Sequence, residues 1–80
     1  MKQFAIQYFA VFREQVGLDR ESVESSASTP AELFAELKAR YGFALKQSSV
    51  KVAINNEFAP WETPLEGGEN IAFLPPMAGG

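Results

Sequence analysis

The sequence predicts an α+β fold in which a mixed sheet wraps around one main helix. The chain of 80 residues carries one strong helical pattern, at residues 30–41, with alternating apolar segments before and after it. Alternation of apolar and polar residues is typical of half-buried strands, whereas apolar residues three and four positions apart indicate a helix. A chain this short buries only one modest core, so strands from both of its ends must share the same helix.

The N-terminal part is predicted to form a hairpin with a helical turn between its strands. Residues 2–9 alternate and predict the first strand. Residues 10–16 place two apolar side chains four positions apart and meet Gly17, which suits a short helical turn with a C-terminal glycine. Residues 20–25 predict a weak, polar second strand that suits a sheet edge. The side chains expected to face the main helix are Phe4, Ile6 and Tyr8.

The main helix has clear start and stop signals. Thr29 can cap it, and Pro30 takes the first helical position, where a missing N–H costs nothing. Glu32 completes a Thr-x-x-Glu capping box. We expect the helix to end near Tyr41, because Gly42 suits the left-handed position that follows a helix. Its apolar stripe consists of Leu33, Phe34, Leu37 and Tyr41.

The segment after the helix is predicted to supply the remaining strands. Residues 50–54 alternate and stop at a turn signal, Asn55 and Asn56, after which residues 57–58 begin a short return strand. A glycine turn at residues 66–69 then leads into the last strand, residues 70–74.

One main helix and this set of strands fit the β-grasp, or ubiquitin-like, roll most simply. Two adjacent prolines at positions 75 and 76 end all regular pairing, because proline has no N–H to donate. We therefore expect a β-grasp domain over residues 1–74 and a flexible tail over residues 75–80.

Composition excludes several classes of function. The chain has neither cysteine nor histidine, so it offers no thiol nucleophile and no usual metal ligand, and we expect neither a metal site nor a bound cofactor. Its 7 basic and 10 acidic residues give a net charge of -3, which argues against a nucleic-acid partner. Without cysteine, a signal-peptide pattern or an apolar run of about 18 residues, the chain is expected in the cytoplasm and not in a membrane.

The remaining polar and aromatic candidates carry no recognisable chemistry. The carboxylates of the predicted second strand and of the glycine turn have no base, nucleophile or metal partner at a telling spacing, so they are interpreted as solvated surface. These residues are Glu21, Glu24, Glu66 and Glu69. Trp61, between Pro60 and Pro64, is interpreted as partly buried packing rather than as a ligand contact.

The chain end differs from the rest of the sequence. Its residues are Pro75, Pro76, Met77, Ala78, Gly79 and Gly80. The prolines stiffen the base of the tail, whereas two glycines without Cβ atoms can thread a narrow channel of a partner enzyme. The α-carboxylate of Gly80 is then the one reactive group that the fold presents. An ordinary frayed terminus is the alternative interpretation of the tail alone.

Four segments together resemble the small, sulfur-carrying subunits of molybdopterin synthase. They are residues 9–17, residues 52–56, residues 64–76 and the final pair of glycines, and the resemblance spans the whole chain. The sulfur carriers of thiamine synthesis and the ubiquitin-related modifiers share the fold and the diglycine. The Phe-Arg-Glu-x-x-Gly run at residues 12–17 is similar to the molybdopterin branch specifically.

The resemblance implies a chemistry that needs no catalytic cluster in this chain. An ATP-dependent, ubiquitin-activating-like enzyme would adenylate Gly80, and a sulfur source would convert the glycyl adenylate into a thiocarboxylate. The large synthase subunit would then use that sulfur to build the dithiolene of molybdopterin, in a heterotetramer of two small and two large subunits. The alternatives are a protein modifier joined through Gly80, a carrier for thiamine or tRNA thiolation, and a passive ubiquitin-like binding module.

Strand alternation also indicates where a partner docks. If Tyr8 and Phe73 face the helix, then Phe9 and Leu74 point away from it, and Phe58 follows a turn where burial is least assured. We call Phe9, Phe58 and Leu74 the docking patch, and carriers of the family that the chain resembles dock through such a surface beside the tail. The alternative is that these side chains close a second, small hydrophobic cluster.

Overall fold

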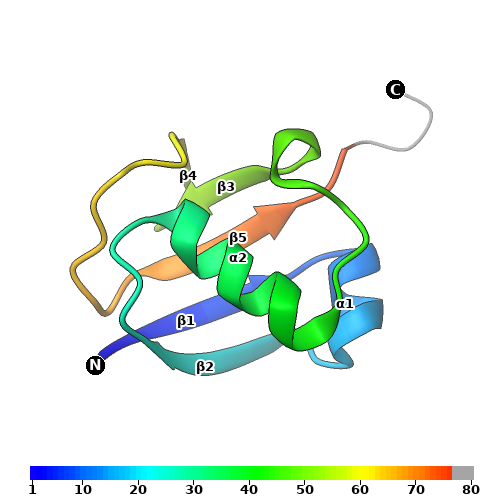
Figure 1. Cartoon of the computed structure of the whole chain (residues 1–80), viewed down its shortest axis with the longest axis horizontal. Helices are drawn as coiled ribbons and strands as arrows, with labels where there is room; N and C mark the ends of the chain where they lie inside the picture. The colour runs from blue at the N-terminus through cyan, green and yellow to red at the C-terminus, as the bar shows by residue number, and fades with distance from the viewer. Residues whose placement is uncertain (77–80) are drawn as a thin grey trace.

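The computed structural model describes residues 1–76 and contains the predicted elements (Figure 1). In chain order they are β1 (Lys2–Tyr8), α1 (Val11–Val16), β2 (Arg20–Ser25), α2 (Pro30–Tyr41), the 3-10 helix η1 (Gln47–Ser49), β3 (Lys51–Ile54), β4 (Glu57–Ala59) and β5 (Asn70–Leu74). The predicted helix at residues 30–41 is confirmed at both ends. Residues 77–80 lie outside the described part, so the predictions for Met77, Ala78, Gly79 and Gly80 stay predictions.

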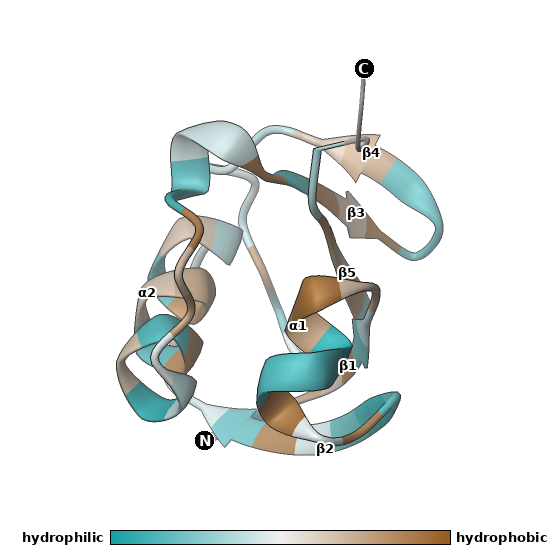
Figure 2. Cartoon of the chain, turned by 90° about the vertical axis from the view of Figure 1, so that its right-hand side faces the viewer, coloured by the Kyte–Doolittle hydropathy of each residue, from teal (hydrophilic) through white to brown (hydrophobic). Residues whose placement is uncertain are grey.

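The strands form one mixed five-stranded sheet in the order β2-β1-β5-β3-β4. The first and last strands, β1 and β5, are parallel neighbours at its centre, and the other pairs are antiparallel. Helix α2 crosses one side of the sheet only, which is plain when the molecule is turned by 90° (Figure 2). This arrangement confirms the α+β roll, with the strands wrapped around one main helix.

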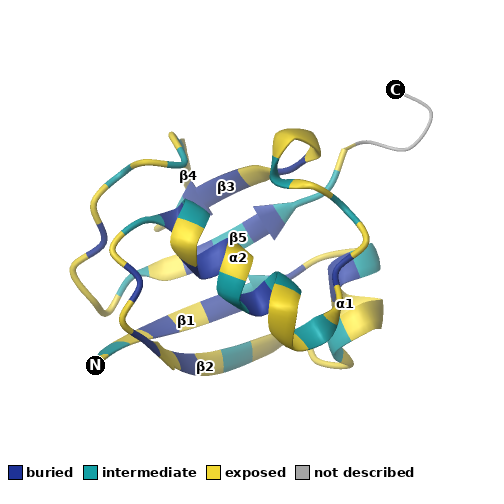
Figure 3. Ribbon diagram, viewed as in Figure 1, coloured by how far each residue is buried: buried dark blue, intermediate teal, exposed yellow. Residues whose placement is uncertain are grey.

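The core lies between α2 and the sheet (Figure 3). On β1 the side chains of Phe4, Ile6 and Tyr8 are almost fully buried, which confirms the predicted alternation. From the opposite layer, Leu33, Phe34 and Leu37 of α2 enter the same cluster, and Tyr41 lies half-buried at its margin. Phe12 of α1 closes one end of the cluster against the rings of Phe34, Phe43 and Phe73.

The start of α2 differs in one bond from the predicted capping box. Thr29 Oγ1 accepts a hydrogen bond from the N–H of Glu32 at 3.3 Å, as expected. The Glu32 carboxylate, however, accepts from the N–H of Ser28 at 2.7 Å and not from the N–H of the cap residue itself. The reciprocal bond therefore reaches one residue further back, because Ser28 turns its free N–H toward the first turn of the helix. At the other end, Gly42 adopts φ 71° as predicted.

A shared carboxylate ties α2 to the β1–β2 edge, which corrects the interpretation of Glu21 as solvated surface. The hydroxyls of Tyr8 and Tyr41 both donate to Oε2 of Glu21, each at 2.6 Å. Burial, followed by the hydrogen bond to Glu21, raises the pKa of Tyr8. The pKa of Tyr41 is also raised, mainly by its own hydrogen bond to Glu21. Both phenols therefore remain protonated donors at neutral pH.

Glu69 was also interpreted as solvated surface; it is partly exposed, and it has a structural role as well. Its carboxylate accepts from the backbone N–H groups of Glu66 at 2.8 Å and of Gly67 at 2.7 Å, and so organises the glycine turn. Partial burial acts to raise the pKa of Glu69, but the backbone hydrogen bonds outweigh this effect, so the net result is a lowered pKa.

Within residues 1–76, no helix is long and apolar enough to cross a membrane.

We expect Leu37→Ala to lower the free energy of unfolding by about 2–5 kcal/mol, because it leaves a cavity at a fully buried site. Urea denaturation measures the change. Ala39→Ser, at an exposed position of the same helix, is the control and should cost less than about 0.5 kcal/mol. A near-neutral Leu37→Ala variant would mean that α2 does not face the sheet in this register.

The backbone conformation of Ala10 predicts that replacing it by glycine stabilises the protein. It adopts φ 50° and ψ -122° at the tight turn in which the N–H of Phe12 donates to the carbonyl of Phe9. A left-handed φ strains any residue with a Cβ by about 1–3 kcal/mol, and glycine relieves that strain at an entropic cost of about 0.5–1 kcal/mol. Ala10→Gly should therefore raise the melting temperature, whereas the control Ala39→Gly, in the interior of α2, should lower it. A lower melting temperature for Ala10→Gly would refute the strained turn.

Candidate functional site

The docking patch lies on the face of the sheet opposite α2. Phe73 is fully buried against α2, so its neighbour Leu74 points to the outer face. Phe9 follows the buried Tyr8 in the same way and is 37% exposed. Phe58 stands opposite Ala53 in the β3–β4 pair and is 69% exposed. The exposure of Phe9 and Phe58 argues against the alternative that these side chains close a second hydrophobic cluster.

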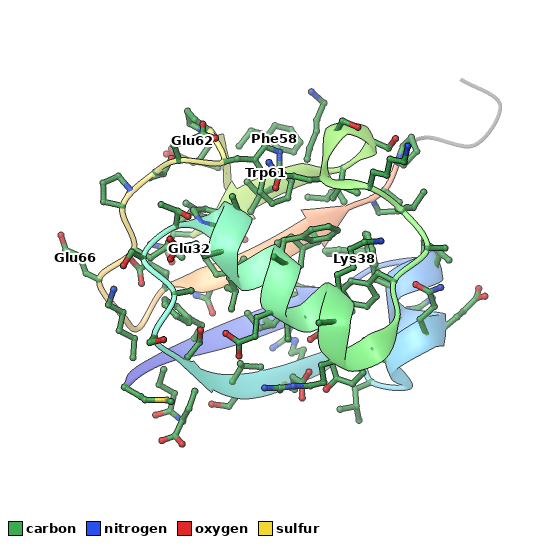
Figure 4. All side chains as sticks on the ribbon, viewed as in Figure 1. Glu32, Lys38, Phe58, Trp61, Glu62 and Glu66 are labelled. Carbon is green, nitrogen blue, oxygen red and sulfur yellow. The ribbon has the colours of Figure 1, made fainter. Side chains whose placement is uncertain are left out.

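Phe58 and Leu74 share an apolar groove of about 1050 Å³. It lies at the open end of the β3–β4 hairpin, away from the turn at Asn55 and Asn56. The larger apolar side chains that line it include Val50, Phe58, Trp61, Leu74, Pro75 and Pro76. Figure 4 shows the side chains of Phe58 and Trp61 close together at this end of the sheet. Phe9 is not part of the groove, so the structure places two of the three predicted patch residues in one concave site and the third elsewhere on the same face.

Trp61 forms a rigid wall of this groove. Its ring stacks on Phe73 with centroids 6.0 Å apart and meets Phe34 edge-on at 5.4 Å. The loop that carries it is held to the start of α2, because the N–H of Ala31 donates to the carbonyl of Trp61 at 3.1 Å. The predicted packing role of Trp61 is confirmed, but its part in the groove was missed, since only the tertiary fold brings residue 61 beside residues 74–76.

The base of the tail leaves from the middle of this site. Leu74 stands opposite Lys51 in the β3–β5 pair, and the chain then passes through Pro75, which is half-buried, to Pro76, which is exposed. Neither proline can donate to a neighbouring strand, so the ladder ends here and the chain is released from the sheet. A protein that covers Phe58 and Leu74 would therefore also contact the start of the tail.

Sequence reasoning also missed Leu18 as an exposed apolar residue near the docking patch. The N–H of Tyr8 donates to the carbonyl of Asp19 at 2.8 Å, so Leu18 lies across from the segment that follows Tyr8. Its side chain is 48% exposed, a value similar to that of Phe9. Leu18 is two residues before Arg20, so the alternation of β2 places both on the same face of the sheet. The sequence alone could not show this, because the β1–β2 register was not known.

The described residues hold no catalytic constellation. Residues 1–76 contain no group of three or more carboxylates that could hold a metal ion. Within the same range every fully buried side-chain nitrogen or oxygen has a hydrogen-bond partner. What this part of the molecule offers is a surface: an apolar groove, the exposed Phe9 beyond it, and a chain end that leaves between them.

Comparison with known proteins identifies the family. The model of the ThiS family matches residues 6–80. A molybdopterin synthase sulfur carrier subunit of Haemophilus influenzae is 33% identical over 78 residues, which cover 94% of this chain and 96% of the relative.

Two solved structures have the same fold. One is the complex of subunits 1 and 2 of molybdopterin-converting factor from Helicobacter pylori, with a TM-score of 0.66, 24% identity and coverage of 98% of this chain and 99% of that one. The other is small archaeal modifier protein 1 of Haloferax volcanii, with a TM-score of 0.80, 18% identity and coverage of 96% and 100%. The family model matches nearly the whole chain, and the fold agrees with it. This protein therefore belongs to the ThiS family of β-grasp proteins.

Proposed function

We propose that this chain is the sulfur-carrier subunit of a molybdopterin synthase and carries sulfur as a thiocarboxylate at Gly80. The observation that carries the proposal is the 33% identity, over 94% of the chain, to a protein of that name. The absence of cysteine from the sequence adds to it, because a carrier without a thiol needs another group to hold sulfur. The family match, which runs through residue 80, points to the terminal carboxyl as that group.

The carboxyl of Gly80 must be activated before it can take up sulfur. A carboxylate is a resonance-stabilised anion at neutral pH and resists nucleophilic attack. Attack of its oxygen on the α-phosphate of ATP releases pyrophosphate and forms a glycyl adenylate. A sulfur nucleophile then displaces AMP, which is a good leaving group, and leaves the thiocarboxylate. An adenylating enzyme would supply the nucleotide site, and this chain would supply only the carboxyl and a surface to hold on to.

The proposed acceptor complex is formed with the large synthase subunit. The H. pylori neighbour is a complex of subunits 1 and 2, and this chain has the same fold. The groove lined by Phe58 and Leu74 lies directly beside Pro75 and Pro76, so a partner seated there would receive the tail. A heterotetramer with two small and two large subunits is the proposed assembly, and the cytoplasm is the proposed compartment.

Extension or shortening of the tail tests the chemistry. Deleting Gly80, or adding one alanine after it, should abolish thiocarboxylate formation because the activated carboxyl is then misplaced. Gly79→Val should impair it nearly as much, since a branched side chain restricts the backbone and widens the threaded segment. Ala78→Ser is the control and should react normally. The readout is the intact mass after incubation with the adenylating enzyme, ATP and a sulfur donor, beside the melting temperature of each variant.

Normal sulfur uptake by the extended chain would rule out the carboxyl of Gly80 as the reacting group. High-mass conjugates to lysine residues of other proteins, lost on deletion of Gly80, would instead favour a protein modifier. These two outcomes separate the sulfur carrier from its main competitor with the same fold.

A charge placed in the groove tests docking. Phe58→Glu should weaken binding to the large subunit by about 30-fold, the loss of about 2 kcal/mol that is typical of an interface hot spot. The fold should remain intact because Phe58 is 69% exposed. Ala39→Glu, on the exposed side of α2, carries the same added charge and should bind normally. Binding is measured by calorimetry. If Phe58→Glu binds the large subunit as tightly as the control Ala39→Glu, the groove is excluded as the docking site.

A further inference from the structure

The outer face of the sheet carries a second hollow, which the docking patch does not include. We call it the alanine hollow: it encloses about 230 Å³ above Ala5, Ala53 and Ala72. These alanines come from three neighbouring strands, since Ala53 stands opposite Ala72 and Ala5 opposite Asn70. Because an alanine side chain ends at Cβ, the sheet surface is low where three of them meet. The larger residues around them form the rim.

The rim of the alanine hollow is built from hydrogen-bond donors. Its polar members are Gln7, Arg20, Asn56 and Asn70. Three of them are amides, and the fourth is a guanidinium with five N–H groups in a planar fork. Arg20 stands opposite Gln7 in the β1–β2 pair, so its charge lies at one side of the hollow.

The charge at this hollow is opposite in sign to that of the chain. The sequence has 10 acidic residues against 7 basic ones, yet no carboxylate lines the hollow. Arg13 and Arg40 form salt bridges with Asp19 and Glu36. Arg20, in contrast, has no salt-bridge partner among residues 1–76.

The alanine hollow lies on the same face of the sheet as the docking patch. Phe58 stands opposite Ala53, one of the floor residues, and therefore lies on the same face of the sheet as the hollow. Leu74 lies two positions along β5 from Ala72 and therefore on the same face. A partner that covers the whole docking patch, from Phe9 after β1 to Phe58 on β4, would span the strands that carry the hollow and reach Arg20 beside Gln7.

We propose that the alanine hollow receives an acidic side chain, aspartate or glutamate, of the large subunit that docks on the outer face. The inference rests on the function proposed above and assigns Arg20 as a specificity residue for it. A carboxylate matches the guanidinium in bidentate geometry, and the amides of Gln7 and Asn70 can satisfy its other lone pairs. The alanine floor gives the side chain room to reach them.

The chemistry of the hollow also explains why an acidic group is preferred over an apolar one. A guanidinium that loses its water without gaining an acceptor is costly, so a partner that presents an apolar side chain here is penalised. A partner with a carboxylate at this point is attracted before contact and held in one register after it. The apolar groove would thus supply affinity, and the alanine hollow would select the partner.

Calorimetric titration of the full-length chain with the large subunit, at low and at physiological salt, tests the proposal. Arg20→Gln should weaken binding about tenfold or more at low salt, as expected for loss of one member of a desolvated charge pair. The same variant should show a smaller salt dependence. Arg20→Lys keeps the charge but not the planar fork, so its affinity should lie between those of the wild type and Arg20→Gln. Arg40→Gln is the matched control, because it removes an equal charge from α2 on the opposite side of the sheet.

A second variant tests the hollow without changing charge. Ala5→Leu, at an exposed strand position, should fill the hollow, weaken binding about tenfold and leave the melting temperature near that of the wild type. Ala39→Leu on α2 is its control. Combined with Arg20→Gln, the Ala5→Leu change should cost little more, because both remove the same contact.

The outcomes separate the inference from the proposed function. Weaker binding of both Arg20→Gln and Ala5→Leu, with unchanged controls, supports the acidic contact. Wild-type affinity and salt dependence in both variants would overturn it and leave the sulfur-carrier proposal intact. Failure of the wild-type chain to bind the large subunit at all would defeat the proposed function, and this inference with it.

Discussion

The parallel pairing of β1 with β5 is the constraint on which the rest of the structure depends. It places the first and last strands of the chain side by side at the centre of the sheet, with Tyr8 opposite Phe73. Strands from before and after α2 can then share one core with that helix, because they belong to the same sheet. The same pairing brings the segment after β1, which carries Phe9, to the point where the chain leaves β5 for the tail.

The two faces of the sheet serve different purposes. The face toward α2 holds aromatic and branched aliphatic side chains that supply the hydrophobic core of a small domain. The outer face holds alanines over its middle, the exposed Phe58 at one edge and Arg20 at the other. Such a surface adds little to folding stability. Its combination of an apolar groove, a shallow hollow and sparse charge is typical of an interface core.

This division between the two faces agrees with the proposed role as a carrier whose partners perform the chemistry. A domain of this size has no depth for an enclosed active site, and residues 1–76 hold neither a metal cluster nor an unpartnered buried polar atom. In the proposed function the chain contributes a carboxyl and a shape, and its partners contribute the nucleotide site, the sulfur and the substrate pocket.

The sequence by itself determined the elements and the core, since both depend on local signals. The Thr29–Pro30 start of α2, the left-handed Gly42 after it and the alternation along β1 each act within a few residues. It also placed Phe9, Phe58 and Leu74 outside the core. Only the tertiary structure decided that Trp61 walls a groove with Pro75 and Pro76, that Glu21 joins two tyrosines, and that alanines from three strands form one hollow. Those features depend on contacts between residues far apart in the chain, and strand order and register, which no local pattern encodes, determine which residues meet.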